Sequence, residues 1–207
     1  MSKPARERIF SRLQAVGTHP LESGPRVEDL PVRPISPTKK IEKLKSLMEA
    51  MRTEVHLTGQ HEWIDKLEEI LKQREIKRML FGPQSPIGDL LLERWKDNDR
   101  ELPELIPYDR EIEQLKDEVF DIDAGITSTY GGIAETGALI LWSSESEPRL
   151  LSLVPPIHIA VLQAEKIYGT FLEAIQNENW AEGMPTNAFL ISGPSKTADI
   201  ELTLAFG

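Results

Sequence analysis

The segment IDAGITSTYGGIAETGALILW, residues 122–142, contains two apolar runs separated by a glycine-rich turn. The first run, residues 122–127, is rich in strand-forming residues and leads into the turn. The second run, residues 138–142, is continuously apolar, which is typical of a buried strand. We therefore expect two strands here, connected through the bend at residues 131–137.

Upstream of this segment, helical and strand patterns alternate. Apolar residues at helical spacing predict helices over residues 39–51, 62–73, 86–96 and 111–118. Runs of β-formers predict strands over residues 54–58, 76–81 and 105–106. Strands that alternate with helices of this length favour an α/β fold with a mainly parallel sheet flanked by helices.

Downstream of the segment, the pattern contains more strands. Residues 150–154, 157–162 and 187–191 are predicted to be strands, and residues 171–180 and 197–206 are predicted to be helices. At the other end of the chain, residues 5–16 predict a short amphipathic helix. Residues 17–38 are rich in proline, which blocks helices and sheet ladders and indicates an extended connector. We therefore divide the chain into an N-terminal helix and connector, residues 1–38, and an α/β domain, residues 39–207.

The composition excludes several classes of function. The 207 residues carry a net charge of −10, which disfavours a broad nucleic-acid interface. The chain has no cysteine, so it cannot hold an iron–sulfur cluster through its own thiolates, and its cofactors stay unknown. It shows no signal-peptide core and no apolar stretch of the ~20 residues that a membrane helix needs. We expect a soluble, cytoplasmic protein without a membrane span.

The first candidate site is the bend at residues 131–137. Glycine allows a ligand to approach the backbone closely, and Glu135 lies among these small residues. A carboxylate in this position acts as a base or nucleophile, or else only caps backbone N–H groups of the turn. Thr127, Gly132 and Thr136 are candidate ligand-binding residues beside it, and the hydroxyls of Ser128 and Thr129 are further candidate donors.

The second candidate site is the bend that follows the strand predicted at residues 187–191. Its candidate ligand-binding residues are Ser192, Gly193, Ser195, Lys196 and Thr197. If a helix begins near Ser195 or Thr197, its first N–H groups bind a carboxylate or phosphate, or else these side chains only cap the helix. Lys196 lacks the glycine spacing of a nucleotide-binding P-loop.

Metal ligands are not indicated. The four histidines, His19, His56, His61 and His158, show no metal-binding spacing. His158 follows two prolines at the start of a predicted strand, where it is either a structural residue or a neighbour of the same cavity.

At these residues the chain resembles the LutC/YkgG family of lactate utilisation proteins, which contain the LUD domain. The resemblance rests on GIT at residues 125–127, IAETG at 133–137, RLLSLVP at 149–155 followed by His158, and SGPSKTADIE at 192–201. It implies a fold related to the NagB/RpiA/CoA-transferase superfamily, with 5-formyltetrahydrofolate cyclo-ligase as a distant relative. Family members usually continue into a His-Gly-Pro turn and a closing strand, so we expect this chain, which stops at Gly207, to lack that strand.

The resemblance also implies a function. It places the chain in a system that oxidises L-lactate to pyruvate, where iron–sulfur subunits carry the electrons and this cysteine-free chain is a non-redox component that binds a small carboxylate or phosphate. One alternative is an enzyme of the CoA-transferase or cyclo-ligase type that uses Glu135. Another is a sensor whose N-terminal segment reports ligand binding.

Overall fold

The computed structural model describes residues 5–15, 35–96, 101–109, 121–180, 183, 187–194, 196–198 and 204–206. By its internal contacts the chain divides into Met1–Val32 and Arg33–Gly207, and each is described by itself. The first contains helix α1, Ala5–Ala15, which confirms the helix predicted there and exposes Ile9 and Phe10. Most of the predicted connector lies outside the described residues, and the domain limits at 38 and 39 remain a prediction.

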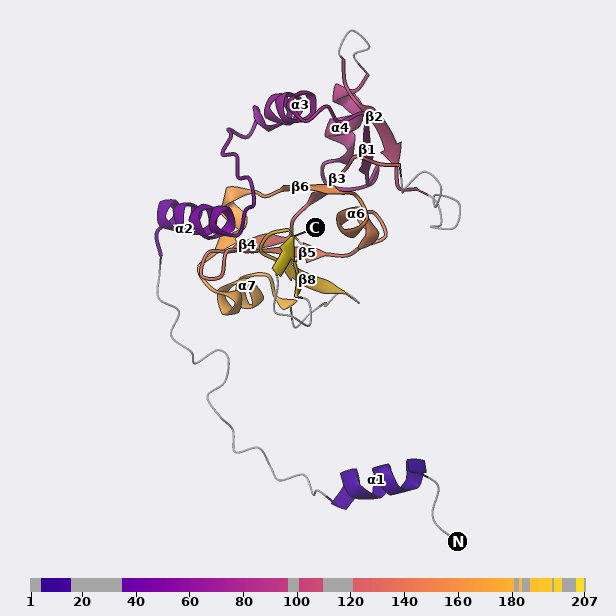
Figure 1. Cartoon of the computed structure of the whole chain (residues 1–207). Coiled ribbons are helices and arrows are strands. Elements are labelled where there is room, and N and C mark those ends of the chain that lie inside the picture. The colour runs from indigo at the N-terminus through magenta and orange to yellow at the C-terminus, as the bar shows by residue number, and fades with distance from the viewer. Residues whose placement is uncertain are drawn as a thin grey trace. The chain divides into compact units, whose positions relative to one another are not determined.

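A four-stranded parallel sheet forms the first layer of Arg33–Gly207 (Figure 1). Its strands are β1 (Arg78–Phe81), β2 (Glu104–Pro107), β3 (Ala124–Ser128) and β6 (Ile157–Val161), in the spatial order β2-β1-β3-β6. Side chains alternate across β1: Met79 and Phe81 pack with helices α3 (Trp63–Gln73) and α4 (Gly88–Arg94). Leu80 packs on the other face with Leu151 of helix α6, Leu150–Leu153. The predicted class, an α/β fold with a parallel sheet flanked by helices, is therefore confirmed.

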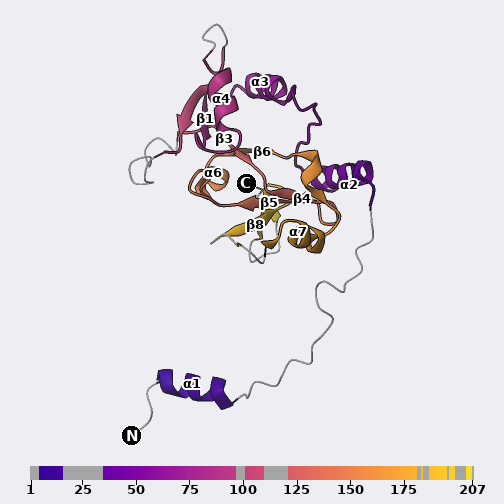
Figure 2. The same ribbon diagram turned by 180° about the vertical axis from the view of Figure 1, so that it is seen from behind.

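A second four-stranded sheet lies against the first (Figure 2). Its order is β7-β4-β5-β8, and its strands are β4 (Gly131–Ile133), β5 (Ala138–Trp142), β7 (Ile167–Tyr168) and β8 (Ala188–Ile191). Strands β4 and β8 both run antiparallel to β5. Helix α2, Pro37–Ala50, packs on one face through Leu44 and Met48, and α7, Phe171–Asn177, packs on the other through Ala174.

Strand β6 connects the two layers, because its successive side chains point to opposite sides. Ile159 and Val161 pack against the core of the parallel sheet, whereas Ala160 packs with α2 and β5. The chain itself passes from one sheet to the other between β3 and β4. There the Tyr130 N–H donates to the carbonyl oxygen of Ile140 in β5, at 2.9 Å.

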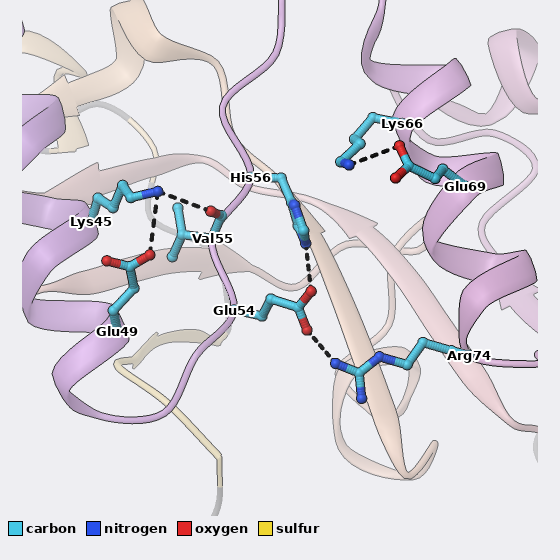
Figure 3. A network of polar contacts seen from close by, with 8 residues as sticks. All are labelled: Lys45, Glu49, Glu54, Val55, His56, Lys66, Glu69 and Arg74. Atoms are coloured by element: carbon cyan, nitrogen blue, oxygen red, sulfur yellow. Dashed lines mark hydrogen bonds and ion pairs between the residues drawn. The ribbon is translucent and has the colours of Figure 1, made fainter.

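Three sequence predictions were wrong. The predicted strand at residues 54–58 is an irregular segment, and its residues pair through side chains instead (Figure 3). Glu54 bonds both His56, at 2.8 Å, and Arg74 of the turn after α3, while Leu57 is exposed. The predicted strand at residues 150–154 contains helix α6, because a short apolar run fits helix and strand equally well.

The third wrong prediction is the final helix at residues 197–206. The structure instead has two antiparallel strands, β9 (Lys196–Ala198) and β10 (Leu204–Phe206). The run TADIELTLAF has apolar residues at every other position as well as at helical spacing, and the structure pairs its two ends as neighbouring antiparallel strands. The helix predicted at residues 111–118 lies outside the described residues.

Candidate functional site

The order of the parallel sheet directs attention to the carboxyl ends of β1 and β3. After β1 the chain goes to β2 on one side, whereas β3 lies on the other side of β1. Adjacent strands whose connections diverge leave a crevice between the loops at their carboxyl ends, and ligands of open α/β sheets bind there. This is the topological switch point of the sheet.

A cavity of about 230 Å³ lies at this switch point. We call it the switch-point cleft. Its lining comes from the loop after β1, the end of β3 and the loop after β5, and consists of Pro86, Ser128, Thr129, Tyr130, Trp142, Ser144, Ser146 and Glu147. Hydroxyl groups, two aromatic rings and one carboxylate therefore face a single open space.

Glu147 is held in place by the end of β3. One carboxylate oxygen accepts the Ser128 backbone N–H at 2.7 Å, and the other accepts the Ser128 hydroxyl at 2.5 Å. The loop also bonds within itself, since the Glu147 N–H donates to the Ser144 hydroxyl oxygen at 3.0 Å and the Ser144 N–H donates to the Glu147 carbonyl oxygen at 3.2 Å. The carboxylate is thus fixed before any ligand arrives.

Gly82, directly after β1, allows the loop after β5 to come close to the end of β1. A Cβ atom at residue 82 would overlap the carbonyl oxygen of Ser146 and lie 3.4 Å from Cγ of Glu147. Any larger residue would push the loop after β5 away from the end of β1. Gly82 is therefore required for the present width of the switch-point cleft.

Aromatic rings form one wall of the switch-point cleft. Tyr130 stacks on Trp142 with ring centroids 4.1 Å apart, and Trp180 meets Trp142 edge to face at 5.2 Å. Such packed rings contribute rigid apolar area. Glu178 lies behind them and accepts from Lys166 and Tyr168. Burial alone would raise the pKa of Glu178, but these hydrogen bonds lower it overall.

A smaller hollow adjoins the switch-point cleft. It measures about 10 Å³, close to the space of one water-sized sphere. It shares Ser128, Trp142 and Glu147 with the switch-point cleft; its other lining residues are Thr127, Leu141, Ser143, Pro148, Arg149, Ser152 and Phe189. The exposed Arg149 guanidinium lies 5.6 Å from the centroid of the Phe189 ring and makes no ion pair with any described residue. No carboxylate of the described residues therefore neutralises this cation.

Thr127 and His158 form a polar pair beneath this region. The two residues come from neighbouring strands, and Thr127 Oγ1 lies 2.9 Å from Nε2 of His158. Thr127 is buried, and burial lowers the pKa of His158 to about 4. His158 is therefore neutral at pH 7. Thr127, predicted as a ligand-binding residue, lines the smaller hollow, although its hydroxyl is already bonded.

Glu135 lies at the opposite end of β5, in the turn between β4 and β5. Its side chain and that of Thr136 are exposed, and Gly132 is buried within β4. The Glu135 N–H donates to the carbonyl oxygen of Gly169, and the Gly137 N–H donates to that of Ile133, both at 3.0 Å. These two N–H groups are already used within the fold. None of these residues lines either of the two cavities described above.

The second predicted bend reaches the same end of the second sheet. Leu139 of β5 pairs with Ile191 of β8, so Ser192 and Gly193 follow directly beside the start of β5. Gly193 lies against Met51 at the end of α2, and Gly137 lies against Leu47 of the same helix. The two bends therefore lie at the same end of the second sheet and against α2, and their described residues line neither of the two cavities. We call this region the bend pair.

The second bend continues into a strand. Residues 196–198 form β9 and not the start of a helix, so these residues do not provide the expected helix-terminus anion site. Lys196 and Thr197 belong to β9, their side chains are not described, and Ser195 lies outside the described residues. Among the described residues, no group of three or more potential metal ligands is present, and no helix has the length and apolar character needed to cross a membrane.

Residues 41–207 match the family model of the LUD domain. The chain belongs to the LUD domain family. It is 38% identical over 208 aligned residues to an uncharacterized protein of Neisseria meningitidis serogroup B, a match that covers 98% of this chain and 88% of that protein. The family resemblance read from the four sequence motifs is thereby confirmed.

Two further similarities link this LUD domain chain to proteins with informative names. Lactate utilization protein C 1 of Bacillus mycoides is 27% identical over 77% of this chain and 70% of that protein. Lactate utilization protein C of Bacillus subtilis is 36% identical over 41% of this chain and 37% of that protein. A crystal structure of a DUF162 family protein from Deinococcus radiodurans shares the fold, with a TM-score of 0.60 and 21% identity over 77% of this chain and 90% of that one.

Sequence reasoning missed most of the switch-point cleft. It named Thr127, Ser128 and Thr129 as candidate donors but did not consider Glu147 or Trp142 as site residues. The available signal was the polar run SSESE at residues 143–147 directly after a buried strand, since polar residues in such loops often carry function. Its closeness to β1 depends on Gly82, which no local pattern reveals.

Proposed function

We propose that the chain is a non-redox component of a cytoplasmic system that oxidises L-lactate to pyruvate, and that it binds a small anionic ligand, a carboxylate, at Arg149. The role in lactate utilisation is supported by the relatives named lactate utilization protein C. The chain's lack of cysteine supports partner subunits that carry the iron–sulfur clusters. The kinship with the NagB/RpiA/CoA-transferase superfamily remains a prediction.

The observation that supports the ligand class is the position of Arg149. Its guanidinium borders the smaller hollow beside the switch-point cleft. Among the described residues, no carboxylate forms an ion pair with this guanidinium. Guanidinium binds a carboxylate through paired hydrogen bonds, and a cation–π contact with the ring of Phe189 helps to position the cation. The bend pair, with Lys196 and Thr197 close in sequence, is the second place proposed for an anion.

The system-level test is genetic. Deletion of the gene is expected to abolish growth on L-lactate as sole carbon source, and the tagged protein is expected to co-purify with iron–sulfur subunits. Normal growth of the deletion strain on lactate would exclude the proposed role.

The ligand-level test uses Arg149→Gln in calorimetric titrations with short carboxylates. Loss of a charge-assisted hydrogen bond should weaken binding by about tenfold or more. Lys72→Gln, which removes an exposed cation on α3 away from both cavities, should bind like the unaltered protein. Equal binding by both variants would place the carboxylate elsewhere.

A second candidate is an enzyme of the CoA-transferase or cyclo-ligase type. The exposed carboxylate of Glu135 favours it, since the side chain projects from a turn that backbone hydrogen bonds hold firmly. Such an enzyme would form an acyl intermediate on Glu135 or use it as a base. Glu135→Gln separates this candidate from the first.

A further inference from the structure

We infer that the switch-point cleft binds an uncharged or cationic group that donates a hydrogen bond to Glu147 and carries a flat apolar part. The ligand would then have two parts: the carboxylate proposed to bind at Arg149, and this hydrogen-bond donor with its flat apolar group in the switch-point cleft. It rests on the proposed binding site, though not on lactate being the substrate of the system.

The charge of the lining supports this assignment. Among the eight described residues that line it, Glu147 is the one with a carboxyl group, and none is a lysine, arginine or histidine. A carboxylate repels an anionic group beside it and attracts a donor or a cation. The switch-point cleft therefore selects against an acid group, whereas in the neighbouring hollow, which Glu147 also lines, Arg149 supplies a positive charge.

Glu147 retains the capacity to accept from a ligand. A carboxylate offers about four lone-pair positions. Ser128 uses one position on each oxygen, through its N–H at 2.7 Å and its hydroxyl at 2.5 Å. The remaining positions belong to a side chain that lines both cavities. Because both bonds come from one residue at the end of β3, the acceptor is oriented in advance, which lowers the cost of ordering it on binding.

The apolar part of the ligand follows from Trp142 and Pro86. Trp142 is the last residue of β5, Pro86 lies in the loop after β1, and both line the switch-point cleft. Trp142 is held by stacking on Tyr130 and by the edge of Trp180. A rigid indole and a proline ring provide a surface for a planar group.

Three probes that share a phenyl ring test the inference: benzylamine, benzyl alcohol and benzoate. Their binding is measured by ligand-observed NMR titration of the full chain carrying Arg149→Gln, so that the carboxylate site proposed at Arg149 does not retain benzoate. Benzylamine is expected to bind more tightly than benzyl alcohol, and benzoate least tightly. In Glu147→Gln, which retains an oxygen that can accept from Ser128, benzylamine binding is expected to fall about tenfold or more, since hydrogen bonds to charged groups are the stronger ones.

The control is Glu145→Gln. Glu145 lies two residues away in the same loop, is exposed and lines neither cavity. It removes the same charge from the surface and should leave all three affinities unchanged. Ser128→Ala provides a second variant: the charge stays, one bond to Glu147 is lost, and benzylamine binding should weaken by a smaller factor than in Glu147→Gln.

Several results would overturn the inference. They are tighter binding of benzoate than of benzylamine, unchanged benzylamine binding in Glu147→Gln, equal effects of the two glutamate variants, or no binding of any probe. None of these results depends on growth on lactate, so failure here is distinct from failure of the proposed system-level role.

Discussion

The two ends of β5 differ in what their loops leave open. At its carboxyl end, the loop after Trp142 borders the switch-point cleft and the hollow of Arg149. At its amino end, the bend pair packs against α2 through Gly137 and Gly193. Five residues at about 3.3 Å each separate these regions by roughly 16 Å.

The comparison shows that small residues have two different uses. Gly137 has a φ of 68° and a would-be Cβ 2.5 Å from Cβ of Leu47, so glycine there permits a turn and a close helix contact. Gly82 permits the approach of two loops around a cavity that polar side chains line. A glycine-rich sequence alone therefore does not distinguish a turn that serves packing from a turn that serves binding, whereas substitutions at Gly137 and Gly82 do.

The largest effect is expected for Gly137→Ala. A residue with a Cβ must adopt a left-handed conformation and displace Leu47, which should lower the free energy of unfolding by about 2–4 kcal/mol. Chemical denaturation measures this change. Gly183→Ala is the matched control, because no atom lies within 4 Å of the added Cβ, and it should change stability by less than about 0.5 kcal/mol.

Gly82→Ala is expected to cost less stability but to damage the switch-point cleft directly. Displacement of Ser146 and Glu147 should lower the free energy of unfolding by about 1–3 kcal/mol. It should also weaken benzylamine binding, whereas Gly137→Ala should leave binding by the folded fraction unchanged. If Gly137→Ala impaired binding more than Gly82→Ala, the assignment of the two ends would be reversed.

The next effect concerns pH and the cleft end of the molecule. Burial lowers the pKa of His158 to about 4, below the value of about 6.5 in the unfolded chain. As the pH falls, His158 therefore takes up a proton in the unfolded state before it does so in the folded state. The stability that neutral His158 gives the folded protein is complete above pH 6.5 and is lost as the pH falls from 6.5 towards 4.

His158→Gln should remove that dependence while an amide still reaches Thr127. Between pH 6.5 and pH 5, the free energy of unfolding of the variant should fall less than that of the unaltered protein, by on the order of 1 kcal/mol. Urea denaturation at several pH values measures it, with the exposed His61→Gln as control. An unchanged pH profile in His158→Gln would mean that His158 is not the responsible group.

The smallest structural effect is expected for Glu135→Gln. The exposed side chain should contribute less than about 0.5 kcal/mol to stability, and carboxylate and benzylamine binding at the other end of β5 should not change. This variant separates the two candidate functions. A loss of acyl or CoA transfer measured with a panel of acyl-CoA substrates, together with loss of covalent trapping at residue 135, would favour the enzyme at the bend pair.

Much of the fold was predictable from local patterns. The periodicity of α2 and α3, the apolar run of β5 and the alternation of helix and strand between residues 62 and 107 all matched the structure. Prediction failed where a short segment satisfied two periodicities, at α6 and at β9 and β10, because periodicity alone does not decide between helix and strand in such short segments. It also failed at residues 54–58, where no neighbouring strand pairs with the segment.

The sequence by itself determined the family, the fold class and the absence of cysteine ligands, because motifs, periodicity and composition are local properties of the chain. Tertiary structure decided which polar residues share a cavity. Ser128 and Glu147 are 19 residues apart and bond each other, and Gly82 and Ser146 meet from two different sheets. Such juxtapositions depend on how β3 and β5 are placed by their sheets, and no spacing along the chain encodes that placement.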